Sequence, residues 1–290
     1  MASKYWDEKL AERYRAYRYE FPQKTLAGKT VVVVGGTGGL GAATVSLLAA
    51  EGARLVVGYR ANRERAESLA RAMREQYGAE LKLVAGDIAE EETRKAYLEA
   101  VIESHPCTPR KDGAPTSSEA DSTFAGVAIF PGDPARVSLE ALEREHLEES
   151  LHTNYVGPVL LAKDLGAAME KSQAGGSVVL LATMQAVAAF SGSLNYGPPK
   201  AALAHAARIL AKEWSRVRVN VVAPGATVAG MAEASVRGGK YDSFAAGGAI
   251  ARFGRPEDVA RAVRFFLEPD NYVTGQVLVV DGGLTLRRDK

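Results

Sequence analysis

The sequence has few of the features that mark secreted, membrane-spanning or disulfide-bonded proteins. Cys107 is its only cysteine, so no intramolecular disulfide can form. The apolar run at residues 178–190 is too short to span a bilayer. The first residues are polar and charged and lack the apolar core of a signal peptide. We therefore expect a soluble cytoplasmic protein that has no membrane partner.

The chain also has almost no net charge and few histidines. Its 36 Lys and Arg residues balance 35 Asp and Glu residues, which leaves a formal charge of +1. This balance argues against a strongly basic nucleic-acid surface and against an acidic tail. None of the four histidines has a convincing metal-ligand spacing to a second ligand. We expect no nucleic-acid partner and no metal, and we interpret His146 and His152 as ordinary helix residues.

Length and patterning predict an α/β protein. The 290 residues, of which 47% are hydrophobic, allow one large domain or two small ones. Short apolar runs at residues 30–34, 54–58 and 81–85 are each followed by a helical pattern, and further strands are predicted at 124–130 and 176–182. Successive strand-helix units imply a Rossmann-type doubly wound parallel sheet, here in one three-layer domain.

Residues 1–27 are predicted to form an N-terminal helical arm that precedes a domain at 28–290. Leu10, Tyr14 and Tyr17 fall on one side at helical spacing, and the helix would end before Pro22. Two interpretations stay open: a helix packed on its own domain, and an arm that covers a neighbouring subunit.

A glycine-rich segment follows the first predicted strand. It reads Gly35-Gly36-Thr37-Gly38-Gly39-Leu40-Gly41 and precedes a helical pattern. Glycines let a strand turn sharply into a helix and let the backbone approach a pyrophosphate, while the helix N-terminus offers free amides. We expect phosphate binding here; the alternative is a tight turn and nothing more.

The ends of the second and third predicted strands suggest which nucleotide binds. Tyr59-Arg60 ends the second strand, where an acidic residue would hold the ribose 2′-hydroxyl of NAD. Arg60 and Arg63 instead suit the 2′-phosphate of NADP, unless they are only surface charges. Asp87, after the third strand, either accepts a hydrogen bond from an adenine amino group or caps the next helix.

Tyr196 and Lys200 are four residues apart, which places them on one face of a helix. A phenol titrates near ~10, and a nearby ammonium would lower that pKa toward neutrality. Pro198 and Pro199 would then lie in the first turn, where proline is tolerated. Thr183, at the end of a predicted strand, either hydrogen-bonds a substrate carbonyl oxygen or is an ordinary β-branched strand residue.

These motifs together resemble the short-chain dehydrogenase/reductase family, of the type usually called classical, over residues 26–286. The family's glycine motif matches at Gly35, Gly39 and Gly41, with Val34 in place of its threonine. Further matches are the Tyr-x-x-x-Lys pair Tyr196 and Lys200, the helical asparagine Asn154, the Pro-Gly turn in 220–225, and the segments 252–260 and 274–283.

The resemblance implies hydride transfer between a nicotinamide cofactor and a carbonyl or alcohol carbon, in a homo-oligomer that is a dimer or tetramer. It implies that Tyr196 is the general acid, Lys200 lowers its pKa and holds the nicotinamide ribose, Thr183 orients the carbonyl, and Asn154 holds a water. The cofactor, NADP with NAD as an alternative, is expected to contact Gly35, Thr37, Gly38, Gly39, Leu40, Gly41, Tyr59, Arg60, Asp87, Ile88, Gly132, Tyr196, Lys200, Pro224, Gly225 and Thr227.

The chain departs from the family pattern at three places. Residues 129–132 read Ile-Phe-Pro-Gly instead of Asn-Asn-Ala-Gly, threonine replaces serine at Thr183, and Ala229 replaces a threonine whose part Thr227 would take. The changed loop and the N-terminal arm motivate a rival function, a cofactor-binding sensor or assembly partner with little catalysis.

A glycine-containing segment at residues 231–250 is predicted to be a mobile substrate-side flap. Val187, Phe190 and Leu194 are interpreted either as lining of a substrate pocket or as core residues.

Overall fold

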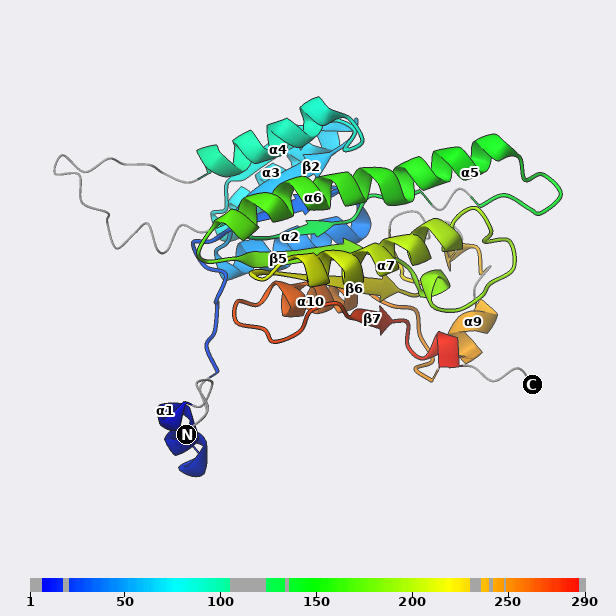
Figure 1. Ribbon diagram of the computed structural model, residues 1–290. Coiled ribbons are helices and arrows are strands. Elements are labelled where there is room, and N and C mark those ends of the chain that lie inside the picture. The colour runs from blue at the N-terminus through cyan, green and yellow to red at the C-terminus, as the bar shows by residue number, and fades with distance from the viewer. Residues whose placement is uncertain are drawn as a thin grey trace.

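The computed structural model in Figure 1 describes residues 7–17, 21–104, 124–133, 136–229, 236–239, 242–247 and 249–286. The predicted loop at 105–122, Cys107, and much of the predicted flap, including Met231 and Tyr241, lie outside the described residues. The same holds for the side chains of Leu10 and Tyr14.

A seven-stranded sheet forms the centre of the fold, with the strand order β3-β2-β1-β4-β5-β6-β7. Every neighbouring pair is parallel, which confirms the predicted doubly wound topology. The central strands are Val-rich because both of their faces are covered. The strands are β1 (Thr30–Val34), β2 (Arg54–Tyr59), β3 (Leu81–Ala85), β4 (Phe124–Ile129), β5 (Gly176–Leu181), β6 (Val217–Pro224) and β7 (Val277–Val280).

Helices cover both faces of the sheet and make the three layers (Figure 1). One apolar cluster joins the sheet to α4, α6 and α7, and a second joins its other face to α2, α3 and α10. The helices are α1 (Glu8–Arg15), α2 (Gly39–Glu51), α3 (Arg63–Tyr77), α4 (Glu91–Glu103), α5 (Arg144–Leu151), α6 (Gly157–Lys171), α7 (Gly197–Glu213), α9 (Asp242–Gly247) and α10 (Pro256–Leu267), with the short turns η1 (His152–Val156), η2 (Met184–Ala186) and η4 (Leu284–Leu286).

The strand order reverses between β1 and β4, and this reversal positions the site. The chain winds outward from β1 through β2 to β3, then returns to β4 and winds the other way. The connections after β1 and β4 therefore run in opposite directions. A crevice lies between them at the carboxyl ends of the strands. In open α/β sheets this switch point is where ligands bind.

The segment just before β1 already belongs to the body of the fold. Leu26 is fully buried in the apolar cluster beneath α2 and α10. Thr25 hydrogen-bonds Glu268 at the end of α10. Helix α1 lies apart from the layers of the sheet in Figure 1. The division into an arm at 1–27 and a domain at 28–290 stays a prediction, as do the two interpretations of the arm.

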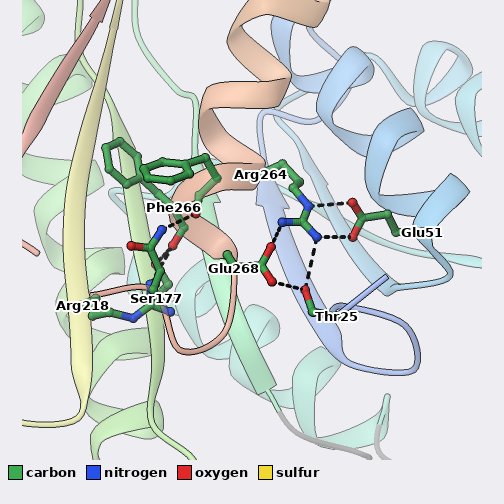
Figure 2. A network of polar contacts seen from close by, with 9 residues as sticks. Thr25, Glu51, Ser177, Arg218, Arg264, Phe266 and Glu268 are labelled. Atoms are coloured by element: carbon green, nitrogen blue, oxygen red, sulfur yellow. Dashed lines mark hydrogen bonds and ion pairs between the residues drawn. The ribbon is translucent and has the colours of Figure 1, made fainter. Parts of the chain in front are cut away.

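An arginine on α10 ties three segments together (Figure 2). Arg264 binds Glu51 of α2 through two hydrogen bonds, with Nε to Oε1 at 2.6 Å and Nη2 to Oε2 at 3.2 Å. It also contacts Glu268 and the hydroxyl of Thr25. Nearby, Ser177 on β5 and Arg218 on β6 both donate to the carbonyl oxygen of Phe266. Side-chain contacts thus hold α10 to the sheet and to α2.

Replacing Arg264 should weaken the fold through this network. Arg264 and Glu51 keep only 21% and 16% of their side chains exposed, so Arg264→Ala leaves two partly buried carboxylates without their cation. We expect a loss of about 2 kcal/mol in the free energy of unfolding, measured by urea denaturation. Arg144→Ala is the matched control, because its pair with Glu148 on α5 is exposed and such pairs contribute little. Equal losses in both variants would contradict the role given to Arg264.

Candidate active site

A cleft of about 270 Å³ lies at the switch point. Its walls come from the carboxyl ends of β1, β2, β3 and β4 and from η1. The lining residues are Val34, Gly35, Tyr59, Arg60, Gly86, Asp87, Ile88, Tyr97, Pro131, Gly132, Asp133, His152, Thr153 and Gly157. The structure thus brings six of the predicted cofactor residues together: Gly35, Tyr59, Arg60, Asp87, Ile88 and Gly132.

The glycine-rich segment makes the sharp strand-to-helix turn that the sequence predicts. Gly35 has φ +70°, and a side chain at Gly41 would stand 2.3 Å from the carbonyl oxygen of Gly35. Gly38 caps α2 and offers no side-chain acceptor to the first helical amides. Those amides belong to Gly39, Leu40 and Gly41, and they give the helix a partial positive end suited to an anion.

The two candidate arginines have different surroundings. Arg60 lines the cleft, whereas Arg63 forms an ion pair with Glu67, with 2.8 Å between Nε and Oε1. Arg60 is therefore the better placed of the two to meet a ligand. Asp87 also lines the cleft, and its Oδ1 accepts a hydrogen bond from the amide of Ala89 at 2.9 Å. The carboxylate fixes the turn before α4, while Glu90 takes the cap position of that helix.

Tyr196 stands at the start of α7, and both prolines fall in the first turn of that helix as predicted. Thr183, which follows β5, lies near enough to the Tyr196 hydroxyl to favour a lower pKa of the phenol. The Thr183 hydroxyl also accepts from the amide of Gln185 at 3.4 Å and so caps η2. The phenol and the threonine hydroxyl are thus held side by side.

Lys200 is almost completely buried, with 2% of the residue exposed. Its ammonium donates to the carbonyl oxygens of Pro131, at 3.1 Å, and Leu181, at 2.9 Å. Those residues follow β4 and end β5, so the lysine joins two strand ends. A side chain at Gly132 would stand 2.8 Å from Lys200 Nζ and 2.8 Å from Asn154 Oδ1. The glycine that the changed loop keeps is the one that this close approach requires.

Asn154 lies in η1, a π-helical turn between α5 and α6. The residue is fully buried. Its Nδ2 donates to the carbonyl oxygen of Asp133 and to Ser150 Oγ, both at 3.0 Å, and its Oδ1 accepts from the amide of Asp133 at 3.2 Å. The side chain fixes the loop after β4, and these bonds leave one lone pair of Oδ1 unused. Interruptions of this kind in helices are frequent at functional sites.

The expected lowering of the pKa of Tyr196 does not occur at this position. Burial raises the pKa of Tyr196 to about 12, and the nearby Thr183 hydroxyl and the charge of Arg136 oppose this only in part. Burial also lowers the pKa of Lys200 to about 7. The expectation was wrong because it counted the neighbouring charge and left out desolvation of both groups.

The Pro-Gly turn after β6 is held by the neighbouring strand. Gly225 donates its amide to the carbonyl oxygen of Val280, and a side chain there would meet Asp281 at 2.7 Å. Thr227 is buried and its hydroxyl donates to the carbonyl oxygen of Gly225 at 3.1 Å. Thr227 therefore shapes the turn, and its part in cofactor binding stays a prediction, like that of Pro224.

An apolar hollow of about 750 Å³ lies beside the start of α7. Val187, Phe190 and Leu194 line it together with Val137 and Leu139. Val187 and Leu194 are 47% and 52% exposed, so the structure decides against the core interpretation for these two. The hollow offers apolar side chains next to the Tyr196 end of the site.

The fold agrees with comparisons to known proteins. A family model described as enoyl-(acyl carrier protein) reductase matches residues 35–285. The chain belongs to the short-chain dehydrogenase/reductase family. Carbonyl reductase family member 4 of Danio rerio is 34% identical over 269 residues, which are 89% of this chain and 98% of that protein. The human 3-oxoacyl-[acyl-carrier-protein] reductase is 33% identical over 264 residues, with coverage of 89% and 98%.

Solved structures of this family share the same fold. A short-chain type dehydrogenase/reductase from Mycobacterium ulcerans superposes with a TM-score of 0.78 at 25% identity, covering 91% of this chain and 92% of that one. ElxO with NADP bound superposes with a TM-score of 0.76 at 20% identity, covering 89% and 99%. Members of the family are oxidoreductases that use NAD or NADP, and the chain is an oxidoreductase of this type.

The sequence did not reveal every residue that lines the cleft. Tyr97, His152 and Thr153 line the cleft but fall within ordinary helical patterns. His152 opens η1 instead of continuing a regular helix, and the ring of His146 accepts from the amide of Glu143 as part of a cap on α5. Within the described residues, no cluster of three or more His, Cys, Asp or Glu side chains is arranged to hold a metal. None of the described helices combines the length and the apolarity needed to cross a membrane.

The burial of Lys200 predicts a pH-dependent stability. Between about pH 7 and pH 10 the unfolded chain holds a proton that folded Lys200 has released, so the free energy of unfolding should rise with pH. Both states are protonated below pH 7, and the effect is absent there. Lys200→Met removes this contribution, so the wild-type advantage over the variant should grow by roughly 1 kcal/mol per pH unit across that window. Urea denaturation measures it, with Lys212→Met on the exposed side of α7 as control. A difference that does not change with pH would refute the burial argument.

Proposed function

We propose that the protein is an NADP-preferring reductase that transfers a hydride to the carbonyl carbon of a small or medium apolar substrate. The observation that carries this proposal is the Tyr196 hydroxyl, which has the Thr183 hydroxyl as a neighbour and is close in sequence to the buried ammonium of Lys200. A carbonyl oxygen needs a proton as the hydride arrives, and a phenol with a raised pKa holds that proton at neutral pH.

The residues of the cleft fit a dinucleotide. The glycines within residues 35–41 allow the tight turn at the N-terminus of α2, where a pyrophosphate would bind, and Arg60 suits a 2′-phosphate. The bound nicotinamide supplies the hydride, and the protein supplies position and proton. Lys200 uses two of its three ammonium donors on Pro131 and Leu181, so one remains for a ribose hydroxyl.

The remaining groups orient the reaction. The Thr183 hydroxyl neighbours that of Tyr196, so a substrate carbonyl oxygen between them would meet two hydroxyls. Asn154 fixes the loop that Lys200 also holds, and a water on its free lone pair would complete a path for the proton. The apolar hollow next to α7 would receive the rest of the substrate. Homo-oligomerisation and a cytoplasmic location stay predictions.

Removing the phenol hydroxyl tests the role of Tyr196. Tyr196→Phe keeps the ring, so NADPH should bind with unchanged affinity while turnover of a ketone falls by about 10²–10⁴-fold, because the proton donor is lost. Tyr272→Phe, at a fully exposed tyrosine, is the control. Unchanged turnover in Tyr196→Phe would contradict the role of Tyr196 as proton donor. If wild-type protein binds NADPH yet turns over no ketone, aldehyde or alcohol, the rival function of a cofactor-binding sensor or assembly partner replaces the enzyme.

Cofactor preference depends on Arg60. Arg60→Ala should weaken NADPH binding by roughly 10–100-fold and leave NADH binding nearly unchanged, because only NADPH carries the 2′-phosphate. Fluorescence titration of both nucleotides measures this. Arg63→Ala is the matched control, since the Arg63 guanidinium is already engaged by Glu67. An equal loss of affinity for NADH would show that Arg60 does not recognise the 2′-phosphate.

A further inference from the structure

Tyr97 brings a buried hydroxyl to the nucleotide end of the cleft. The residue lies on α4, packs in the apolar cluster beneath that helix and is 1% exposed. It nonetheless belongs to the cleft lining, together with Arg60, Asp87 and Ile88. The small accessible part of this tyrosine therefore faces the cleft and not bulk solvent.

A glycine on the neighbouring strand makes room for this hydroxyl. A side chain at Gly58 would place its Cβ 1.7 Å from Tyr97 Oη and 2.7 Å from Tyr97 Cζ. No real side chain fits at that separation, so the phenol end occupies the space that any other residue at position 58 would fill. Gly58 comes one residue before Tyr59 and two before Arg60, at the carboxyl end of β2. The hydroxyl thus lies next to the groups proposed to hold the nucleotide.

The hydroxyl lies against the backbone of Gly58, at the edge of the cleft that Tyr97 lines. Polar groups in such largely buried positions are normally satisfied by protein, water or ligand. Burial also raises the pKa of Tyr97, so the group stays protonated and able to donate. A donor in this position is suited to a ligand acceptor.

We propose that Tyr97 Oη is a nucleotide-binding group that hydrogen-bonds the adenosine part of the dinucleotide. This inference rests on the proposed NADP-dependent function. Tyr97 shares its surroundings with Tyr59, Arg60 and Asp87 on the β2 and β3 side of the switch point, whereas Tyr196 and Thr183 follow β5 on the other side. Adenosine offers ring nitrogens and ribose oxygens as acceptors. The nicotinamide end of the dinucleotide would lie near Tyr196.

Tyr97→Phe tests the proposal, because it removes one oxygen and keeps the ring in its packing. We expect the affinity for NADPH and for adenosine 2′,5′-bisphosphate to fall by the same factor, about tenfold, since both carry the adenosine part. Isothermal titration measures both ligands. The melting temperature of the ligand-free variant should stay the same, because the ring keeps its packing and the hydroxyl faces the cleft. Tyr272→Phe serves as the control.

The changes in ligand affinity and in melting temperature together separate ligand binding from a structural role. Unchanged affinity for both ligands overturns the proposal, and so does a loss for NADPH that the bisphosphate does not share. Weaker binding together with a clearly lower melting temperature also overturns it, because the hydroxyl would then support the fold itself. If the wild-type protein binds neither ligand, the nucleotide-binding function fails along with the inference. Wild-type binding with unchanged affinity in Tyr97→Phe leaves that function standing.

Discussion

The ammonium of Lys200 lies between the carboxyl ends of β4 and β5 and donates to the carbonyl oxygens of Pro131 and Leu181. A buried cation is costly unless such acceptors surround it, so the two strand ends and α7 must keep this geometry together. Gly132 follows one of the acceptors and has no room for a side chain beside Lys200 and Asn154. The loop after β4, the start of α7 and η1 thus share one set of contacts. The positions of Tyr196 and Thr183 depend on it.

The same constraint explains how the chain tolerates its unusual loop. Residues 129–132 have lost the polar side chains of the family pattern, but the contacts that organise the site use main-chain atoms. Lys200 binds the carbonyl of Pro131, and Asn154 binds both the amide and the carbonyl of Asp133. Main-chain contacts survive a change of side chain as long as the backbone path is kept. Retention of Gly132 is what keeps that path open.

Much of the fold followed from the sequence, because buried parallel strands leave a clear signal. The run Thr30–Val34 is apolar throughout since both faces of β1 are covered, and the glycines after it mark the turn into α2. Parallel strands place their carboxyl ends on one edge, so residues that follow strands, such as Arg60, Asp87 and Thr183, were predictable site residues. Arg60 and Asp87 line one cleft, and bringing them together required only the strand order.

Other features had no local signal. The π-helical turn at η1 interrupts a continuous helical pattern, so Asn154 was expected in a regular helix. Tyr97 looks like any apolar helix position, and only its contact with Gly58, on a different strand, shows where its hydroxyl lies. The pKa of Tyr196 depends on burial, which a four-residue spacing cannot report. Each of these depends on contacts between segments that are distant in the sequence.

Titration of the purified protein with NADPH and with NADH, followed by nicotinamide fluorescence, tests the central claim most directly. The switch-point cleft, with its glycine turn, Arg60 and the Lys200 contacts, is proposed to bind a phosphorylated dinucleotide. We therefore expect saturable binding of both nucleotides and tighter binding of NADPH. Tighter binding of NADH would contradict only the role of Arg60 in selecting NADPH. Binding of neither nucleotide would contradict the account as a whole.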